Sequence, residues 1–545
     1  MVKDSRSLSN PELDYLKSYI NPHFKFTNVE VLGDKQKIAR FATDQVEEPL
    51  YWQPFGFLRS LIKHSWVGYM EQEHEEVQDT SNVTLAQSVE TFGIELLRQS
   101  TGTVYDEDKV RLNREGIAQF LGKILSLRQT ANDNELLIYN WHTCTYELSQ
   151  QDQVLGKIIT AVTNAVVPDS WTQGVDAHIT ALLSRSLKPI DGDDFDKKYA
   201  AFGTRLINMD TLKNGGEANP LKLTRMHSDV QFEPKAKCPM FRQFLNEVLP
   251  DPQDQDFLQQ YTGYLLDSSF KANVFLVIKG DGRNGKSVYL NLVKKLLGKL
   301  NISSSKIESF AGDFGMAPMV NKRANLSSEG QTVDFDTAEI KAICSGDSVT
   351  INAKNQAQYT TVLKTKLIFV TNNMPTTSDT SDGFSRRLNI LPFQIQIPLE
   401  KVDVDLEVKL ATELPGILNW ALTGLSKLRT NNFNFTISKA MREAKDDYML
   451  FSRPVERFIK GCLIENRSAT LSMKYLREQY SQWVKRESIA DRGTTNPSIF
   501  SKKLREAFQS LWGQPAPIVN MHGHVNGLAG YSLREGEMLD EKQQQ

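Results

Sequence analysis

The sequence predicts an α/β fold with a phosphate-binding loop at its centre, an α-rich region before it and a winged-helix module after it. Residues 274–298, VFLVIKGDGRNGKSVYLNLVKKLLG, run from an apolar strand through a glycine-rich loop into a helical pattern. The apolar runs KLIFVTN and LNILPF follow, as expected of further strands in one buried sheet. Near the C-terminus, two helical patterns precede two β-like runs, which indicates a separate small module.

Length and composition indicate a multidomain globular protein. The chain has 545 residues, and a prior of about 150 residues per domain predicts several domains. Hydrophobic residues make up 40% and charged residues 24%, and no apolar run approaches the ~20 residues of a membrane helix. The first residues, MVKDSRSLSNPELDYL, lack the apolar core of a secretory signal. We therefore expect a cytoplasmic protein with no membrane partner.

The cysteines and the charge distribution narrow the function further. Cys144, Cys238, Cys344 and Cys462 lack paired spacing, which predicts buried thiols and argues against a zinc ribbon or disulfides. The formal net charge is -2, yet residues 436–510 carry fifteen Lys or Arg against nine Asp or Glu. A basic segment inside a neutral chain is typical of a local nucleic-acid surface.

The glycine-rich loop, GDGRNGKS, matches the pattern G-x-x-x-x-G-K-[ST]. In such loops the backbone N–H groups wrap the phosphates, a lysine reaches the β and γ phosphates, and a hydroxyl holds magnesium. The predicted binding residues are Gly280, Asp281, Gly282, Arg283, Asn284, Gly285, Lys286 and Ser287. The loop therefore predicts a nucleoside triphosphate and Mg²⁺ as ligands.

Three kinds of side chain that hydrolysis requires follow the loop in the sequence. A carboxylate serves the metal and the water, a polar side chain contacts the γ-phosphate, and an arginine stabilises the developing charge. Glu329 in ANLSSEG, Asn372 at the end of KLIFVTN, and the pair Arg386 and Arg387 before LNILPF are the candidates.

This order of motifs resembles the superfamily 3 helicases, and more narrowly the phage and plasmid primase-helicase group that includes the poxvirus-type NTPases. The resemblance rests on GDGRNGKS, SSEG, IKAICSGDSVT, TNNMP and DGFSRRLNILPF. CPMFRQFLNEVLPD and LQQYTGYLL before the ATPase, and ELPGILNWALTGL after it, agree with it. It covers roughly residues 200–465 and implies an AAA+-like ATPase core.

The resemblance also implies a role for each candidate. Lys286 and Ser287 would contact phosphate and magnesium, and Glu329 would be the Walker B acid and second metal ligand. Asn372 would be the polar sensor, while Arg386 or Arg387 would reach a neighbouring subunit as an arginine finger in a ring, expected to be hexameric. The cofactors would be ATP and Mg²⁺. One departure is that Asn325, Ser327 and Ser328 make the strand before Glu329 more polar than in the family.

Two segments are candidates for DNA binding. Members of the superfamily grip DNA with a β-hairpin between the Walker B and sensor strands, and the matching segment here is VTINAKNQAQYTTVLKTKLIFV, with Lys354 near its tip. A solvated turn lysine is the alternative. In the basic segment, Leu471, Leu476, Tyr480 and Val484 predict one helix face. Pro497 opens a second helix, with an inward face and an outward basic face. The predicted inward residues are Ile499, Phe500, Leu504 and Phe508, and the outward ones are Lys502, Lys503 and Arg505.

The alternative for the C-terminal segment is a helical bundle with solvated charges. His522 and His524 lack neighbouring ligands, so we expect a structural role for them. Near the N-terminus, NELLIYNWHTCTYEL predicts a hairpin and QVLGKIITAVTNAVV a helix. DGDDFD at residues 191–196 indicates a linker loop, because of its glycine and helix-breaking neighbours. It lacks a companion histidine or third acid, so we do not expect primase activity.

The domain boundaries follow from these assignments. We predict an N-terminal domain of unassigned role at residues 1–130, a collar or loading domain at 131–265, the ATPase at 266–430, and a winged-helix DNA-binding domain at 431–545. Aromatic residues between Tyr51 and Tyr69 are better explained by burial than by base stacking.

Two main functions fit the sequence, and a third possibility, a packaging translocase, would use the same nucleotide site. The first is a ring-shaped, ATP-dependent replicative DNA helicase of a phage, plasmid or other mobile element, moving with three-prime to five-prime polarity on single-stranded and forked DNA. A primase or an initiator would be its further partner. The second is an origin-binding initiator that ATP only switches. The paired arginines and the hairpin favour the first, because a binding switch has less need of either.

Overall fold

The computed structural model describes residues 15–16, 18–21 and 97–534, apart from 107–108, 132–133, 151–152, 218, 311, 313, 329–336, 353–357, 375–376, 378, 380, 488–493 and 522–524. Glu329, Lys354, the aromatic residues between Tyr51 and Tyr69, and both histidines of the C-terminal hairpin lie outside these ranges. None of the described helices combines the length and hydropathy that a bilayer crossing requires.

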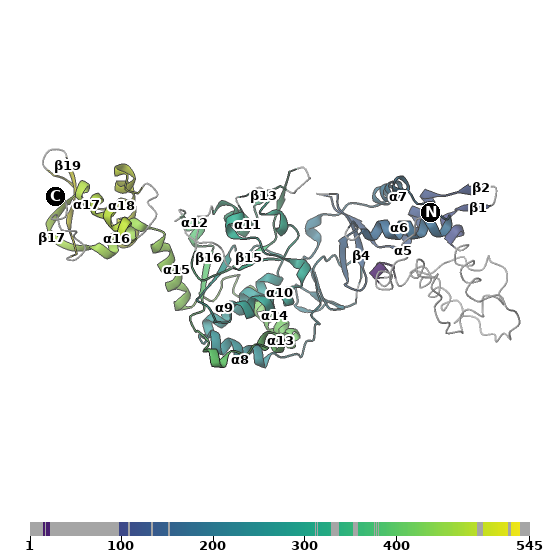
Figure 1. Cartoon of the computed structure of the whole chain (residues 1–545), viewed down its shortest axis with the longest axis horizontal. Helices are drawn as coiled ribbons and strands as arrows, with labels where there is room; N and C mark the ends of the chain where they lie inside the picture. Colours follow the sequence, from purple (N-terminus) through teal and green to yellow (C-terminus); the bar gives the residue numbers. More distant parts are fainter. Residues whose placement is uncertain are drawn as a thin grey trace. The chain divides into compact units, whose positions relative to one another are not determined.

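A parallel sheet forms the centre of the domain that carries the glycine-rich loop. Within the described part of the chain it has five strands, in the order β11-β12-β15-β10-β16, of which β15 and β16 are labelled in Figure 1. The strands are β10 (Phe275–Lys279), β11 (Ile302–Ser303), β12 (Ala324–Ser328), β15 (Lys366–Thr371) and β16 (Leu388–Pro392). All six residues of β15 and the first four of β10 are buried, as in parallel strands with both faces covered. The α/β fold and the buried strand before the loop are thus confirmed.

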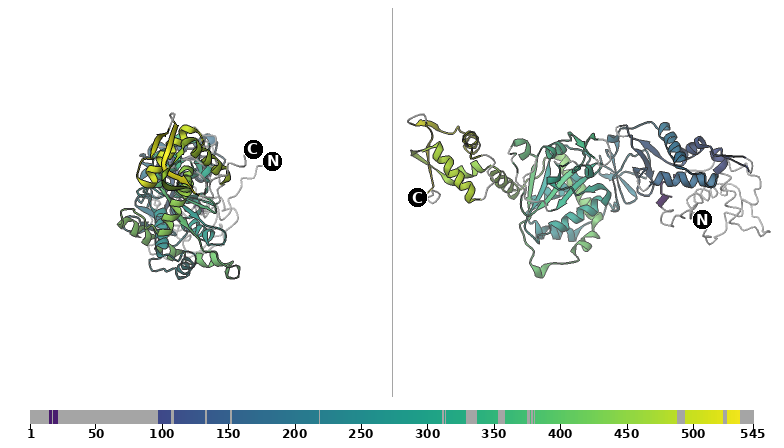
Figure 2. Two further views of the ribbon diagram at one scale, coloured as in Figure 1. Left: turned by 90° about the vertical axis from the view of Figure 1, so that its left-hand side faces the viewer. Right: turned by 45° about the horizontal axis from the view of Figure 1, so that its top comes forward.

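Helices cover both faces of this sheet (Figures 1 and 2). On one face, Ile340 and Ile343 of α11 and Tyr448 of α15 share a hydrophobic core with alternate residues of β10, β15 and β16. On the other face, the hydroxyl of Tyr261 in α9 donates 2.7 Å to the carbonyl oxygen of Leu367 in β15. The helices are α9 (Pro252–Leu266), α10 (Lys286–Leu297), α11 (Ala338–Ser345), α14 (Leu414–Thr430) and α15 (Lys439–Phe451).

Two glycines set the contact between α9 and α14. A Cβ atom on Gly263 would lie 2.3 Å from the carbonyl oxygen of Ala421, and one on Gly424 would lie 2.0 Å from that of Gln259. Real Cβ atoms do not approach a backbone so closely, so the two helix backbones touch directly at this crossing. Gln259 adds a hydrogen bond of 3.0 Å from its side-chain amide to the Trp420 carbonyl.

The predicted hairpin between the Walker B and sensor strands is also present. Its strands β13 (Ser348–Ile351) and β14 (Tyr359–Val362) pair antiparallel, with Ser348 opposite Val362 and Ile351 opposite Tyr359. Val349 and Ile351 are buried, whereas Thr350 and Tyr359 face outward. The base of the hairpin is therefore anchored in the hydrophobic core beside the sheet.

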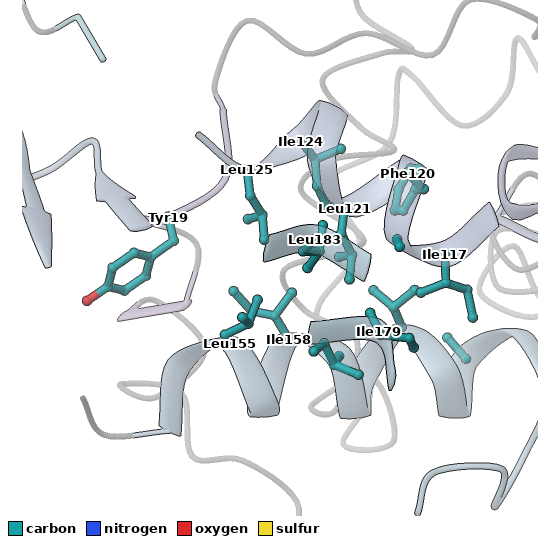
Figure 3. Close-up of a cluster of buried hydrophobic side chains, with 14 of the residues drawn as sticks. Tyr19, Ile117, Phe120, Leu121, Ile124, Leu125, Leu155, Ile158, Ile179 and Leu183 are labelled. Carbon is teal, nitrogen blue, oxygen red and sulfur yellow. The ribbon is translucent and has the colours of Figure 1, made fainter. Parts of the chain in front are cut away.

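The N-terminal part is described by itself. Helices α5, α6 and α7 pack around a core that includes Tyr19, Ile117, Leu121, Ile158 and Ile179 (Figure 3). The predicted hairpin and helix are confirmed as β4–β5 and α6. The larger elements are α5 (Arg114–Ile124), β4 (Leu136–Asn140), β5 (Thr145–Leu148), α6 (Val154–Val166), α7 (Gln173–Ser186), β6 (Tyr199–Phe202) and β7 (Arg205–Asn208).

This part is more mixed than the α-rich region expected. Within the described ranges, a sheet in the order β3-β4-β5 and another in the order β8-β7-β6-β9 accompany the helices. Several of these strands are too short to show a clear alternating pattern: β3 (Leu127–Gln129), β8 (Lys213–Asn214) and β9 (His227–Ser228). The acidic DGDDFD segment is not the simple linker loop predicted, because it contains a short 3-10 helix, η4 (Gly192–Asp194), and the Asp196 carboxylate accepts hydrogen bonds from the backbone N–H groups of Arg225 and Met226.

The C-terminal part consists of helices around a small antiparallel sheet in the order β17-β19-β18 (Figure 2). Phe500, Leu504 and Phe508 are buried, as predicted, but Ile499 is 41% exposed, because it lies one position away from the buried face. Leu471 lies in a strand rather than in the predicted helix, which begins at Met473. The elements are α16 (Pro454–Cys462), β17 (Leu463–Ser472), α17 (Met473–Arg486), α18 (Pro497–Trp512), β18 (Ile518–Met521) and β19 (Val525–Leu533).

Candidate nucleotide-binding site

The glycine-rich loop joins the carboxyl end of β10 to the first residue of α10. Gly285 has φ +83°, a left-handed conformation that strains any residue with a Cβ atom. A Cβ atom there would also lie 2.9 Å from the Phe244 ring, and one on Gly280 would lie 2.3 Å from the Phe393 carbonyl oxygen. Both glycines are therefore required for the path of the loop.

The side chain of Lys286 is buried within the loop. Its ammonium donates to the carbonyl oxygens of Gly280 and Asp281 and to Oδ1 of Asn284, the last two at 2.9 Å. Asn284 is fixed in turn, because its Nδ2 donates 2.9 Å to the Phe393 carbonyl. An ammonium held between loop carbonyls, at the amino end of a helix, fits the binding of a polyphosphate anion. Ser287 is exposed beside it.

The ends of three neighbouring strands meet at the loop. In the sheet register, Lys279 lies opposite Thr371, and Ser328 lies opposite Val370. Asn372 therefore follows a strand end that borders the loop, and the Gly280 N–H donates 3.2 Å to the Thr371 carbonyl. Glu329 directly follows Ser328 in the sequence but lies outside the described residues.

The polar residues of β12 have a structural explanation. Asn325 is fully buried, and its Oδ1 accepts from Ser303 Oγ at 2.9 Å and from the Ser305 N–H at 2.7 Å. Its Nδ2 donates 2.7 Å to the Ser305 carbonyl. Asn325 thus ties β12 to the chain around β11, so its polarity does not argue against a Walker B strand.

A cavity of about 910 Å³ opens over the loop. Besides the loop and Asn372, two segments that the sequence did not predict as site residues line it: helix α8 (Pro239–Val248), and residues 395–409 with α13 (Leu406–Ala411). Glu413 fixes α8, because its carboxylate accepts from the N–H groups of Met240 at 3.1 Å and Phe241 at 2.9 Å. The motif CPMFRQFLNEVLPD, which contains α8, was the sequence signal that could have indicated this side of the cavity.

The two candidate arginines lie at the amino-terminal ends of the strands, whereas the loop lies at their carboxyl-terminal ends. Leu388, which follows them, pairs with Phe275 at the start of β10, whereas Pro392 pairs with Lys279 beside the loop. Four residues at about 3.3 Å each separate the two ends of the strand by roughly 13 Å. Neither arginine lines the cavity. The loop and the arginines are therefore not brought together within this chain.

The two arginines differ in their surroundings. Arg387 is half-buried and donates 2.6 Å to the Gly383 carbonyl and 2.5 Å to Ser345 Oγ. Arg386 is exposed, and its side chain makes no hydrogen bond or ion pair with the residues that the structure describes. Only Arg386 is thus available to another molecule.

The remaining candidates are on the C-terminal helix α18. Lys502 and Arg505 are exposed, while Lys503 pairs with Glu506 at 2.8 Å. Across the described ranges, no three His, Cys, Asp or Glu side chains gather as metal ligands. The four cysteines are buried free thiols, as predicted.

Comparison with known proteins gives a family match and a similar viral protein. Residues 278–387 match a family model described as a family of unknown function, DUF5906. The chain is also 26% identical, over 158 residues, to a protein of Acanthamoeba polyphaga mimivirus named "Putative helicase L207/L206". The chain is similar to a viral helicase. The resemblance stated from the motifs is thereby confirmed.

This helicase-like similarity is partial. It covers 28% of this chain and 16% of the mimivirus protein, so the chain spans far less than two thirds of that relative. Two structures of the NrS-1 C-terminal region, both apo, cover 76% of this chain at TM-scores of 0.42 and 0.43, with 12% and 11% identity, and 97% and 98% of those chains are covered. The roles of individual helicase-like residues stay predictions.

Proposed function

We propose that this chain is an ATP-dependent replicative DNA helicase of a phage, plasmid or other mobile element, which acts as a ring on single-stranded and forked DNA. The observation that carries the proposal is the buried Lys286 ammonium inside a strand–loop–helix phosphate cradle, with Asn372 at the neighbouring strand end. An ammonium held there is placed for the β and γ phosphates of a nucleoside triphosphate.

The residues present fit ATP and magnesium. The loop N–H groups and Lys286 would hold the phosphates, and α8 and residues 395–409 would enclose the rest of the nucleotide. Ser287 and Glu329 would hold Mg²⁺, which would neutralise phosphate charge during hydrolysis. Asn372, next to the loop, would contact the γ-phosphate and orient the attacking water.

The sheet order agrees with an AAA+-like core of superfamily 3. Strand β15 lies between β10 and β12, so the sensor Asn372 and the Walker B acid Glu329 would flank the loop on one side. By strand geometry the arginines lie about 13 Å from the loop, at the amino-terminal ends of the strands. This separation favours an arginine finger that acts on a neighbour, with Arg386 as the finger.

Such a shared site implies a ring, proposed as a hexamer, whose channel would contain the β13–β14 hairpin and Lys354. The C-terminal part has the order helix, strand, two helices and hairpin, which suits a winged-helix module with Lys502 and Arg505 turned toward DNA. A cytoplasmic location, and a primase or initiator as partner, belong to the same proposal. The exposed basic face of α18 also suits the second candidate, an origin-binding initiator that ATP switches without processive unwinding.

Strand displacement on forked DNA tests the proposal. The full chain should open the fork only with ATP and Mg²⁺, and only from a tail of one polarity. Lys286→Ala should abolish both hydrolysis and displacement, while Lys299→Ala, which removes an exposed lysine away from the cavity, should change neither. Normal turnover by Lys286→Ala would refute the site. ATPase activity and DNA binding without displacement, from any tail, would favour the initiator.

A further inference from the structure

Hydrogen bonds join both ends of helix α11 to the chain around the candidate arginines: one end to Asp379, just before the segment that carries them, and the other end to Arg387. This segment, residues 381–387, is called the arginine segment below. It contains α12 (Asp382–Ser385), which Ser381 caps by accepting 3.3 Å from the Phe384 N–H. The ring of Phe384 is buried against that of Phe275, with centroids 5.9 Å apart. The arginine segment is thus a packed element.

The first tie joins the amino end of α11 to Asp379, just before the arginine segment. One carboxylate oxygen of Asp379 accepts from the Thr337 hydroxyl and, at 2.7 Å, from the Lys341 ammonium. The other accepts 2.9 Å from the Ser381 N–H. Burial raises the pKa of the Asp379 carboxyl, but hydrogen bonds from Lys341, Ser381 and Thr337 outweigh it and hold the pKa well below its usual range.

The second tie joins the carboxyl end of α11 to Arg387. The guanidinium bridges Ser345 Oγ, at 2.5 Å, and the Gly383 carbonyl within the arginine segment, at 2.6 Å. Since the two ties lie at opposite ends of a helix of eight residues, α11 cannot rotate or slide relative to the arginine segment without breaking one of them.

The same helix leads directly into the hairpin. Gly346 ends α11 in a left-handed conformation with φ +74°, and a Cβ atom there would lie 2.7 Å from the Phe270 ring. Strand β13 begins two residues later. The turn between helix and hairpin is therefore short and fixed by packing, so a shift of α11 must be passed to β13.

We propose that α11 couples the nucleotide of the neighbouring subunit, contacted by Arg386, to the grip of the β13–β14 hairpin on DNA, and that Asp379 and Ser345 are positioning residues for this coupling. The inference rests on the proposed function. Neither residue lines the cavity over the loop: Asp379 accepts from Lys341 and Thr337, and Ser345 accepts from Arg387. They would act on the coupling between the Arg386 contact with nucleotide and the hairpin contact with DNA.

The experiment compares ATP hydrolysis by the full chain with and without single-stranded DNA. Asp379→Asn, Lys341→Met and Ser345→Ala each break one tie. Asp382→Asn is the matched control, because that aspartate is exposed in the same segment and makes no side-chain bond with the described residues. The tie variants should keep basal hydrolysis within about twofold but lose about fivefold or more of the DNA stimulation.

The pair can also be tested by a double-mutant cycle. If Asp379 and Lys341 act through each other, the double variant should lose no more stimulation than either single variant. Stimulation at the wild-type level in Asp379→Asn would overturn the proposal, as would a proportional loss of basal and stimulated rates, which indicates damage to the fold. A wild-type protein that hydrolyses no ATP under either condition would instead refute the proposed function.

Discussion

The Nζ atom of Lys366 lies 2.6 Å from the carbonyl oxygen of Asp267 in the interior of the domain that carries the glycine-rich loop. The rings of Tyr264 and Phe270 surround it, with centroids 5.1 Å and 5.4 Å away. The carboxylate of Asp267 faces Arg429, at 2.6 Å. Burial, aided by the nearby Arg323 charge, lowers the pKa of Lys366 to about 7.

This lysine should make stability depend on pH. Its pKa in the unfolded chain is about 10.4, so between roughly pH 7 and pH 10 the unfolded state binds more protons than the folded state. The free energy of unfolding should therefore rise with pH across that window. In Lys366→Met the rise should be smaller by a few kcal/mol. Urea unfolding of both proteins at several pH values measures the difference, and parallel pH profiles would contradict the assignment.

A second prediction concerns the shared site. Arg386→Ala should bind ATP but hydrolyse it at least ~10³-fold more slowly, because the arginine meets charge that develops only in the transition state. Lys286→Ala should also be inactive, but because it lacks the ammonium that holds the phosphates. Mixing the two variants should restore part of the activity, since some interfaces would pair an intact loop with an intact finger. Phosphate release is followed after mixed rings are verified by mass.

Two outcomes would contradict the shared site. No recovery in verified mixed rings would leave the arginine acting in its own subunit or not at all. If Arg387→Ala instead lost hydrolysis and regained it on mixing with Lys286→Ala, while Arg386→Ala lost no hydrolysis, Arg387 would be the finger. Because Arg387 bonds Ser345 and Gly383, we expect its removal to lower stability as well as activity.

A third prediction concerns the hairpin. Lys354→Ala should slow unwinding by about tenfold while basal hydrolysis changes less than about twofold, because a phosphate contact holds DNA without taking part in the nucleotide site. Lys299→Ala should leave both rates unchanged. Equal losses of unwinding and hydrolysis would place Lys354 in the fold or in the ATP site.

A fourth prediction concerns α18. Lys502→Ala and Arg505→Ala should each weaken DNA binding uniformly across sequences and reduce the slope of log affinity against log salt by about one. Lys503→Ala should do less, because its ammonium already pairs with Glu506. Fluorescence anisotropy at several salt concentrations measures the slopes. A slope unchanged in all three variants would remove α18 from the DNA interface.

The loop and the strands around it could be predicted because their signals are local. A buried strand, glycines and a helix follow one another within one short stretch, and each pattern depends on adjacent residues. The α8 wall could not be predicted in this way, since the contact of Phe244 with Gly285 joins residues far apart in sequence. The role of Asn325 depends equally on where Ser303 and Ser305 come to lie.

The C-terminal helices show where local patterns mislead. Leu471 and Leu476 suit one apolar face, yet Ser472 caps α17 by accepting 3.2 Å from the Tyr475 N–H and so starts the helix after Leu471. The difference between Arg386 and Arg387 was also inaccessible, because neighbouring arginines look alike until their partners are known.

The crossing of α9 and α14 has a consequence for how the chain is made. Gly263 touches a backbone that is synthesised roughly 160 residues later, which at about 5–20 residues per second is an interval of roughly 10–30 s. Strand β10 likewise has both its neighbours, β15 and β16, downstream. The nascent sheet domain therefore leaves the ribosome with apolar helix and strand surfaces uncovered for that interval, and these surfaces are exposed to aggregation until α14 emerges.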